Sequence, residues 1–177
     1  MTESMTQMVG VALPTLRELR GAVLTSGDPE AAVYALREAG YAGGDAVHAA
    51  FETWLAEASN AERVDAGDLS LAEFGESTTT FFRDAGWGTV TFSQDEAEGV
   101  AIVDIEDCWE GPVAGDAGCQ ITTGLLASFF GRIAGYPVAV LETECCSSGA
   151  SSRCRFLLGN DEVMAAKWEE LSGGSPG

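Results

Sequence analysis

Four of the five cysteines in this 177-residue chain lie between Cys119 and Cys154, and Glu142 lies among them. Cys119 opens a predicted helix, and the other residues surround a predicted hairpin turn. Zinc takes about four ligands, commonly from Cys, His and Asp/Glu side chains. Thiolates and a carboxylate from a helix start and a hairpin therefore indicate a closed zinc site. The alternative is that these cysteines are small buried apolar residues, as free cysteines often are.

The spacing within the hairpin limits how such a site could form. Glu142 and Cys145 are three positions apart, so on a regular strand they would face opposite sides. They can share a metal only if the strand bulges or ends between them. Cys146 competes with Cys145, because it has the same strand parity as Glu142. We expect Cys119 in the first helical turn, where unpaired N–H groups lower the pKa of a thiol. Cys108 lies outside this group and is expected to be an ordinary buried thiol.

Helix signals dominate the first half of the chain. Asp28, Pro29 and Glu30 form a start signal, with a capping carboxylate, a first-turn proline and an acid that favours the helix dipole. The helix that they open should end near Gly40. Expected helices cover residues 13–24, 29–40, 41–58 and 70–85.

The pattern changes to strands after Gly88. Residues 89–93 alternate and are β-branched, which is typical of a strand. Further strands are expected at 100–106, 138–146 and 153–158, with helices at 119–134 and from 161 to 171. N-terminal helices followed by the order ββ-α-ββ-α predict an α+β fold, with one mainly antiparallel sheet packed by helices.

Composition narrows the partners. The formal net charge is −19, from 28 acidic and 9 basic residues, and such a charge disfavours nucleic acid and anionic membranes. No apolar run approaches the roughly 18 residues of a membrane span. The first residues lack the charged region of a signal peptide, so we expect a cytoplasmic protein with reduced thiols. We expect one domain over 11–171, with a flexible N-terminus (1–10) and a flexible tail (172–177).

The sequence also resembles the 4-vinyl-reductase-like domain family. The specific part is Cys119-Gln-Ile-Thr-Thr-Gly124 together with Glu142-Thr-Glu-Cys145-Cys146-Ser-Ser-Gly149. Further similarity covers residues 40–44, 81–88, 131 and 154–156. The resemblance implies an α+β fold related to transport-particle (TRAPP) subunits and to haem-based nitric oxide sensors.

Phenol-sensing activators of this family hold a structural zinc through three cysteines and one glutamate, near an aromatic-effector pocket. By this resemblance the metal ligands are Cys119, Glu142, Cys145 and Cys154. The gap from Gly149 to Cys154 is one residue longer than the usual pattern, which keeps Cys146 open as an alternative to Cys145.

These observations favour a zinc-containing domain that binds a small hydrophobic or aromatic molecule as a sensor or carrier. The candidate pocket walls are Phe82, Trp87 and Trp109, because both tryptophans flank loop glycines. A zinc with four protein ligands has no open position for water, so catalysis is not expected. The family precedent implies a homodimer. The alternatives are a 4-vinyl reductase or accessory factor of tetrapyrrole (bacteriochlorophyll) synthesis, and a protein-interaction scaffold.

Overall fold

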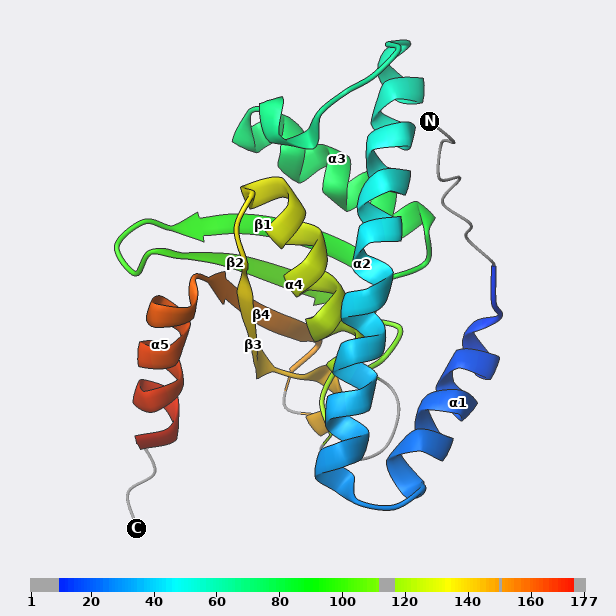
Figure 1. Cartoon of the computed structure of the whole chain (residues 1–177), viewed down its shortest axis with the longest axis vertical. Coiled ribbons are helices and arrows are strands. Elements are labelled where there is room, and N and C mark those ends of the chain that lie inside the picture. The colour runs from blue at the N-terminus through cyan, green and yellow to red at the C-terminus, as the bar shows by residue number, and fades with distance from the viewer. Residues whose placement is uncertain (1–9, 112–116, 150, 174–177) are drawn as a thin grey trace.

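A four-stranded antiparallel sheet with helices against it forms the body of the protein (Figure 1). The computed structural model describes residues 10–111, 117–149 and 151–173. The predicted flexible segments, 1–10 and 172–177, fall mostly outside this described part. The helices are α1 (Leu13–Thr25), α2 (Pro29–Ser59), α3 (Leu71–Asp84), α4 (Gln120–Ala134) and α5 (Asp161–Gly173), with short 3-10 turns η1 (Ala66–Asp68) and η2 (Cys146–Ser148). The strands are β1 (Thr89–Asp95), β2 (Val100–Glu106), β3 (Ala139–Glu144) and β4 (Arg153–Gly159).

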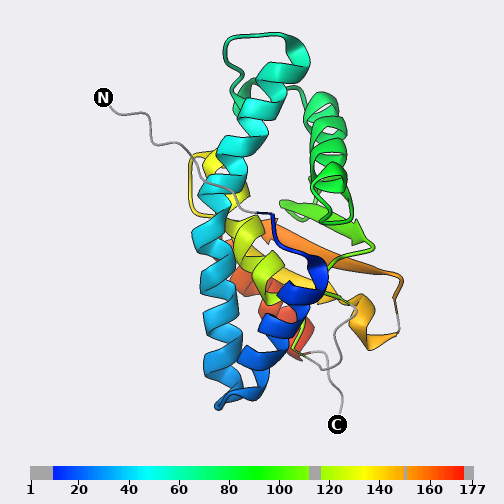
Figure 2. The same ribbon diagram turned by 90° about the vertical axis from the view of Figure 1, so that its right-hand side faces the viewer.

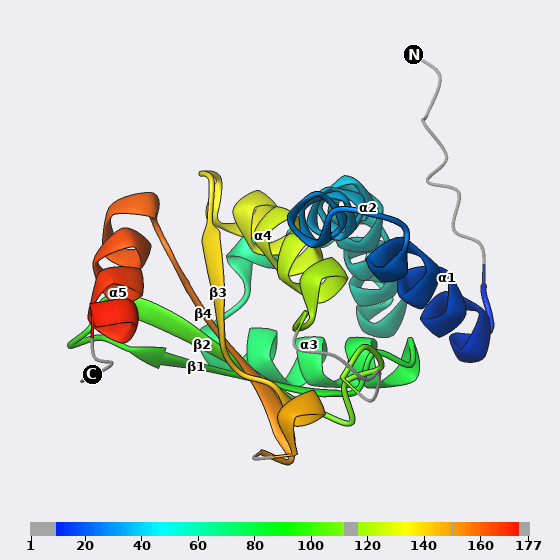
Figure 3. The same cartoon turned by 90° about the horizontal axis from the view of Figure 1, so that it is seen from below.

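The strand order is β1-β2-β4-β3, and each neighbouring pair is antiparallel. Two hairpins therefore meet along β2 and β4, and α4 connects the first hairpin to the second. The predicted α+β class and its ββ-α-ββ-α order are confirmed. Seen from below, α2 and α4 lie together on one side of the sheet (Figure 3).

Helix α2 is one continuous helix of 31 residues, so the predicted end near Gly40 is wrong. Its start is as predicted: the Asp28 side chain accepts a hydrogen bond from the Glu30 N–H over 3.1 Å. Glycine inside a helix costs about 1 kcal/mol relative to alanine. Close packing against α4 offsets this cost, because a Cβ on Gly40 would lie 2.0 Å from the Ile121 carbonyl oxygen. The glycine therefore serves helix contact and not helix termination.

Aromatic side chains fill the interior between the helices and the sheet. Phe51, on α2, is fully buried and contacts Phe81 and Phe129, with ring centroids 5.2 and 5.5 Å apart. Phe74, on α3, meets Phe92 of β1 at 5.4 Å. These edge-to-face contacts join α2, α3, α4 and the sheet in one core.

Helix α1 lies beside the N-terminal half of α2 in both side views (Figures 1 and 2). The other helices bury apolar side chains, but the buried residue of α1 is Arg20. Among the described residues, none of the helices combines the length and the apolar character that a bilayer span requires.

Candidate metal centre and ligand pocket

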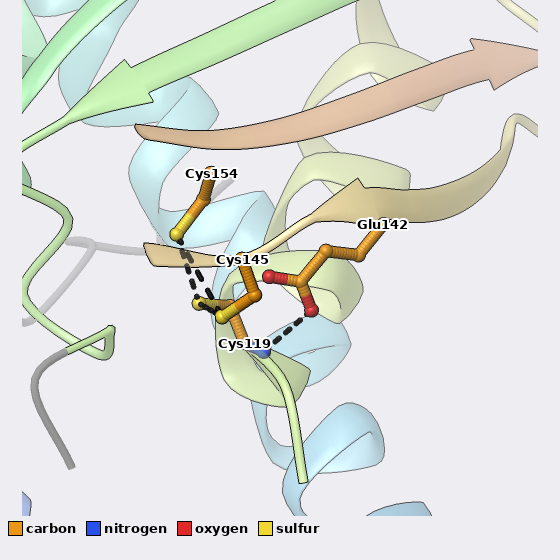
Figure 4. Close-up of side chains that lie close together, drawn as sticks. All are labelled: Cys119, Glu142, Cys145 and Cys154. Carbon is orange, nitrogen blue, oxygen red and sulfur yellow. Dashed lines mark hydrogen bonds between the residues drawn. The ribbon is translucent and has the colours of Figure 1, made fainter. Parts of the chain in front are cut away.

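The side chains of Cys119, Glu142, Cys145 and Cys154 converge at the end of the second hairpin (Figure 4). Their sulfur and carboxylate oxygen atoms all lie within 4.8 Å of one another. Cys119 is the N-cap residue of α4, Glu142 is on β3 and Cys154 is on β4. Cys145 directly follows β3 and precedes η2. The tertiary fold thus gathers these four residues from three elements.

The sulfur positions suit a tetrahedral thiolate site. The Cys119 sulfur lies 3.5 Å from that of Cys154 and 3.8 Å from that of Cys145, and the last two sulfurs are 4.0 Å apart. Zinc–sulfur bonds of about 2.3 Å in tetrahedral geometry place neighbouring sulfurs about 3.8 Å apart.

The Glu142 carboxylate supplies a further test of fit. One oxygen, Oε2, accepts a hydrogen bond from the Cys119 backbone N–H over 2.7 Å. The other oxygen, Oε1, is buried and has no hydrogen-bond partner. A buried carboxylate oxygen without a donor is costly unless a cation binds it. The three sulfurs and this oxygen therefore fit a divalent zinc-like ion.

A strand irregularity brings Glu142 and Cys145 to the same site. The pairing of β3 with β4 shifts register between Glu142 and Glu144, and Cys145 lies beyond the end of the strand. This is the bulge or strand end that the spacing required. Cys146 is not in the group of four, although its sulfur lies 3.4 Å from that of Cys154.

Cys108 is buried, as expected, but it is not remote from the other thiols. Its sulfur lies 3.8 Å from that of Cys119. This contact lowers the pKa of Cys108 to about 3, and it raises the pKa of Cys119. The shift at Cys119 is opposite to the prediction from the helix dipole, because the neighbouring thiol outweighs the dipole. Sequence spacing missed this contact, since it depends on how the connection from β2 to α4 folds back.

A buried ion pair supports the α4 start. The Glu110 carboxylate accepts hydrogen bonds from the backbone N–H groups of Ile121 and Thr122, over 3.1 and 2.9 Å. Arg20 of α1 donates to the same carboxylate over 3.0 Å and to the Gly118 carbonyl over 2.5 Å. Burial raises the pKa of Glu110. Sequence reasoning missed this pair; its signal was a charged residue, Arg20, at an apolar-stripe position of the first helix.

The predicted pocket walls form part of the core. Phe82 and Trp109 are 2% and 4% exposed. The Trp87 ring meets those of Trp109 and Phe82 edge to face, with centroids 5.7 and 6.4 Å apart. The structure brings these three residues together, but none of them lines the pocket described next.

An apolar pocket of about 550 Å³ opens between α3, the β1–β2 hairpin and the C-terminal end of α4. Its aromatic lining residues are Phe74, Phe92, Phe130 and Tyr136. The charged residues of its lining are Asp95 and Glu96, both acidic. The pocket is therefore an aromatic cavity with a negative rim.

Comparisons with known proteins identify part of the chain. Residues 101–160 match the family model of the 4-vinyl-reductase domain. The matched region includes β2, α4 and the second hairpin, and so contains all four clustered residues. No curated protein matches the chain.

Two solved structures resemble the whole fold to different degrees. The phenol-responsive sensory domain of the transcription activator PoxR, crystallised with phenol, has a TM-score of 0.61 and 22% sequence identity. That similarity covers 96% of this chain and 85% of the PoxR domain. A vinyl-4-reductase family protein from Methanocaldococcus jannaschii has a TM-score of 0.39 and 18% identity, over 85% of this chain and 96% of its own. The first similarity shows that the family-matching region and the preceding helices share the fold of a sensory domain.

Proposed function

We propose that this chain is a 4-vinyl-reductase-like domain that binds a small hydrophobic or aromatic molecule, in a sensor or carrier role, and contains a structural zinc ion. The pocket of about 550 Å³ carries this proposal, because small-molecule sites usually measure about 300–1,000 Å³ and have apolar walls. The sensory domain with the same fold supports it, since that domain was crystallised with phenol.

The lining defines the ligand class. Phe74, Phe92 and Phe130 offer ring faces and edges to an aromatic ligand. Asp95 and Glu96 repel an anion at the rim, and the net charge of −19 adds to this repulsion. The ligand is therefore neutral or cationic, and carboxylates are excluded.

The zinc role is structural. Cys119, Glu142, Cys145 and Cys154 would fill all four positions of a tetrahedral ion, which leaves none for water. When bound, the ion supplies a cross-link between the start of α4 and the second hairpin. The reductase alternative has only the family name of one structural neighbour in its favour. Homodimer formation, a cytoplasmic location, the TRAPP relation and the scaffold alternative stay predictions.

A binding experiment with the full chain tests the ligand proposal. We expect saturable binding of 2-naphthol by calorimetry, and at least tenfold weaker binding of the carboxylate 2-naphthoate. Ala134→Trp should weaken 2-naphthol binding, because Ala134 lines the pocket from the exposed end of α4. Ala166→Trp is the matched control, since Ala166 is an exposed helical alanine of α5 outside this lining. No saturable binding of 2-naphthol, phenol or indole, or equal loss in both variants, would contradict the proposal.

A further inference from the structure

The metal cluster contains more thiols than one zinc ion uses. Four positions are filled by Cys119, Glu142, Cys145 and Cys154 in the proposed zinc site. Cys108 and Cys146 remain, and both are free thiols in contact with that set. A buried excess of thiols beside a metal site needs a chemical explanation.

The two additional thiols lie against the two central ones. Cys108 sulfur is 3.8 Å from Cys119 sulfur, and Cys146 sulfur is 3.4 Å from Cys154 sulfur. Cys119 and Cys154 are themselves 3.5 Å apart and have no exposed surface. The central pair therefore has Cys145 and Glu142 as neighbours in one set, and Cys108 and Cys146 as neighbours in another.

We propose that this cluster binds two soft divalent ions of the zinc and cadmium class, with the Cys119 and Cys154 thiolates bridging them. Glu142 and Cys145 complete the coordination of the first ion. Cys108 and Cys146 complete that of the second. The inference rests on the proposed zinc site and adds a second metal to it.

Local structure keeps the second set of thiols in place. A Cβ on Gly111 would lie 2.0 Å from the Cys146 sulfur and 3.5 Å from the Cys154 sulfur, so a glycine at this position leaves room for both. The Cys146 backbone N–H donates to the Cys154 sulfur over 3.4 Å, which favours a thiolate there.

Charge also favours a second ion. Five thiolates and one carboxylate carry more negative charge than one divalent ion neutralises, and Cys108, Cys119 and Cys154 are all buried. Unpaired buried charges are costly. With a second divalent ion, all five thiols can ionise. Soft thiolates prefer ions of this class, such as zinc, over magnesium or calcium.

Metal stoichiometry of the full chain tests the inference. The reduced apoprotein is titrated with Cd²⁺ without oxygen, and bound ions are counted by native mass spectrometry. We expect two cadmium ions per chain in the unmodified protein and one in Cys108→Ala/Cys146→Ser. One ion in the unmodified protein would overturn the second site but leave the proposed zinc site intact. No bound ion would overturn both.

Cadmium NMR provides a readout that does not depend on the variant folding. With ¹¹³Cd, we expect two thiolate-type resonances that split each other through the bridging sulfurs. Oxygen-bound cadmium on the acidic surface gives resonances in a different range. Two resonances without mutual splitting would mean separate sites and would overturn the bridging arrangement.

Discussion

The backbone N–H of Cys119 donates to the Glu142 carboxylate over 2.7 Å, which joins the start of α4 to β3 across 23 positions of sequence. Gly118 makes this approach possible. Its φ is +66°, and a Cβ there would lie 2.4 Å from Glu142 Oε2. One carboxylate thus anchors the helix start through Oε2 and leaves Oε1 for a metal.

Glu142→Gln should weaken zinc binding while it preserves the anchor. The amide oxygen can still accept from Cys119, but the negative charge is lost. Loss of an outer hydrogen-bond partner weakens metal sites about 10–100-fold, and loss of a ligand should reach at least that range. Competition with a chromogenic chelator measures the change. Glu144→Gln is the control, because Glu144 pairs with Arg153 and Arg155 instead; equal weakening in both variants would exclude Glu142 as a ligand.

Removal of the metal should destabilise the fold. Structural zinc binding is coupled directly to folding free energy, so a chelator should lower the unfolding free energy by several kcal/mol. Cys154→Ser should contain less zinc, start at lower stability and respond less to the chelator. Thermal unfolding with elemental analysis checks both effects. If chelator left the melting temperature of the unmodified protein unchanged, the ion would have no structural role.

Arg20→Met should destabilise the protein by about 3 kcal/mol, because it leaves the buried Glu110 carboxylate without its cation. Urea unfolding measures this. Arg83→Met is the control, since the Arg83–Asp84 pair has side chains 55% and 59% exposed and should contribute under about 1 kcal/mol. Adding Glu110→Gln to Arg20→Met should cost less than the sum of the two single changes. Strict additivity would show that the two residues are not coupled.

Gly44→Ala should destabilise the α2–α4 contact by about 1–3 kcal/mol, the usual cost of overpacking. Its Cβ would lie 2.2 Å from the Ser128 Cβ. Gly43→Ala is a matched control in the same helix, because a Cβ there meets nothing within 4 Å. It should stabilise α2 by about 0.5–1 kcal/mol. Ser128→Gly should partly rescue Gly44→Ala in thermal unfolding, and the absence of rescue would place the conflict elsewhere.

Acid stability should depend on Asp104. A bidentate contact with Arg155, over 2.7 and 2.8 Å, lowers the pKa of Asp104. A carboxyl group with a lowered folded-state pKa stabilises the fold above its unfolded pKa, near 3.9, and this stability is lost as pH falls through the folded value. Asp104→Asn should therefore flatten the decline of unfolding free energy below about pH 4. An unchanged decline would assign it to other carboxyl groups.

Local sequence patterns predicted the element order but not every helix boundary. Alternation and turn residues identified the two hairpins, and the Asp28–Pro29 signal identified the start of α2. The continuity of α2 past Gly40 was not predictable, because the compensating contact with Ile121 is tertiary.

The candidate site shows the same division. Chain spacing and family resemblance brought together Cys119, Glu142, Cys145 and Cys154, and the structure places them within reach of one ion. The proximity of Cys108 and the Arg20–Glu110 pair depended on how distant segments pack. The aromatic pocket was missed for a similar reason: its walls come from α3, both hairpins and the end of α4.

The uninterrupted length of α2 limits how the two ends of the molecule can communicate. A straight helix of 31 residues extends roughly 46 Å. Near its start it contacts α4 beside the thiol cluster, and farther along it packs on the aromatic core through Phe51. A rod of this kind transmits rotation or translation but cannot fold at its middle. Motion that a bound effector causes must therefore displace α3 or the β1–β2 hairpin, or move the whole rod.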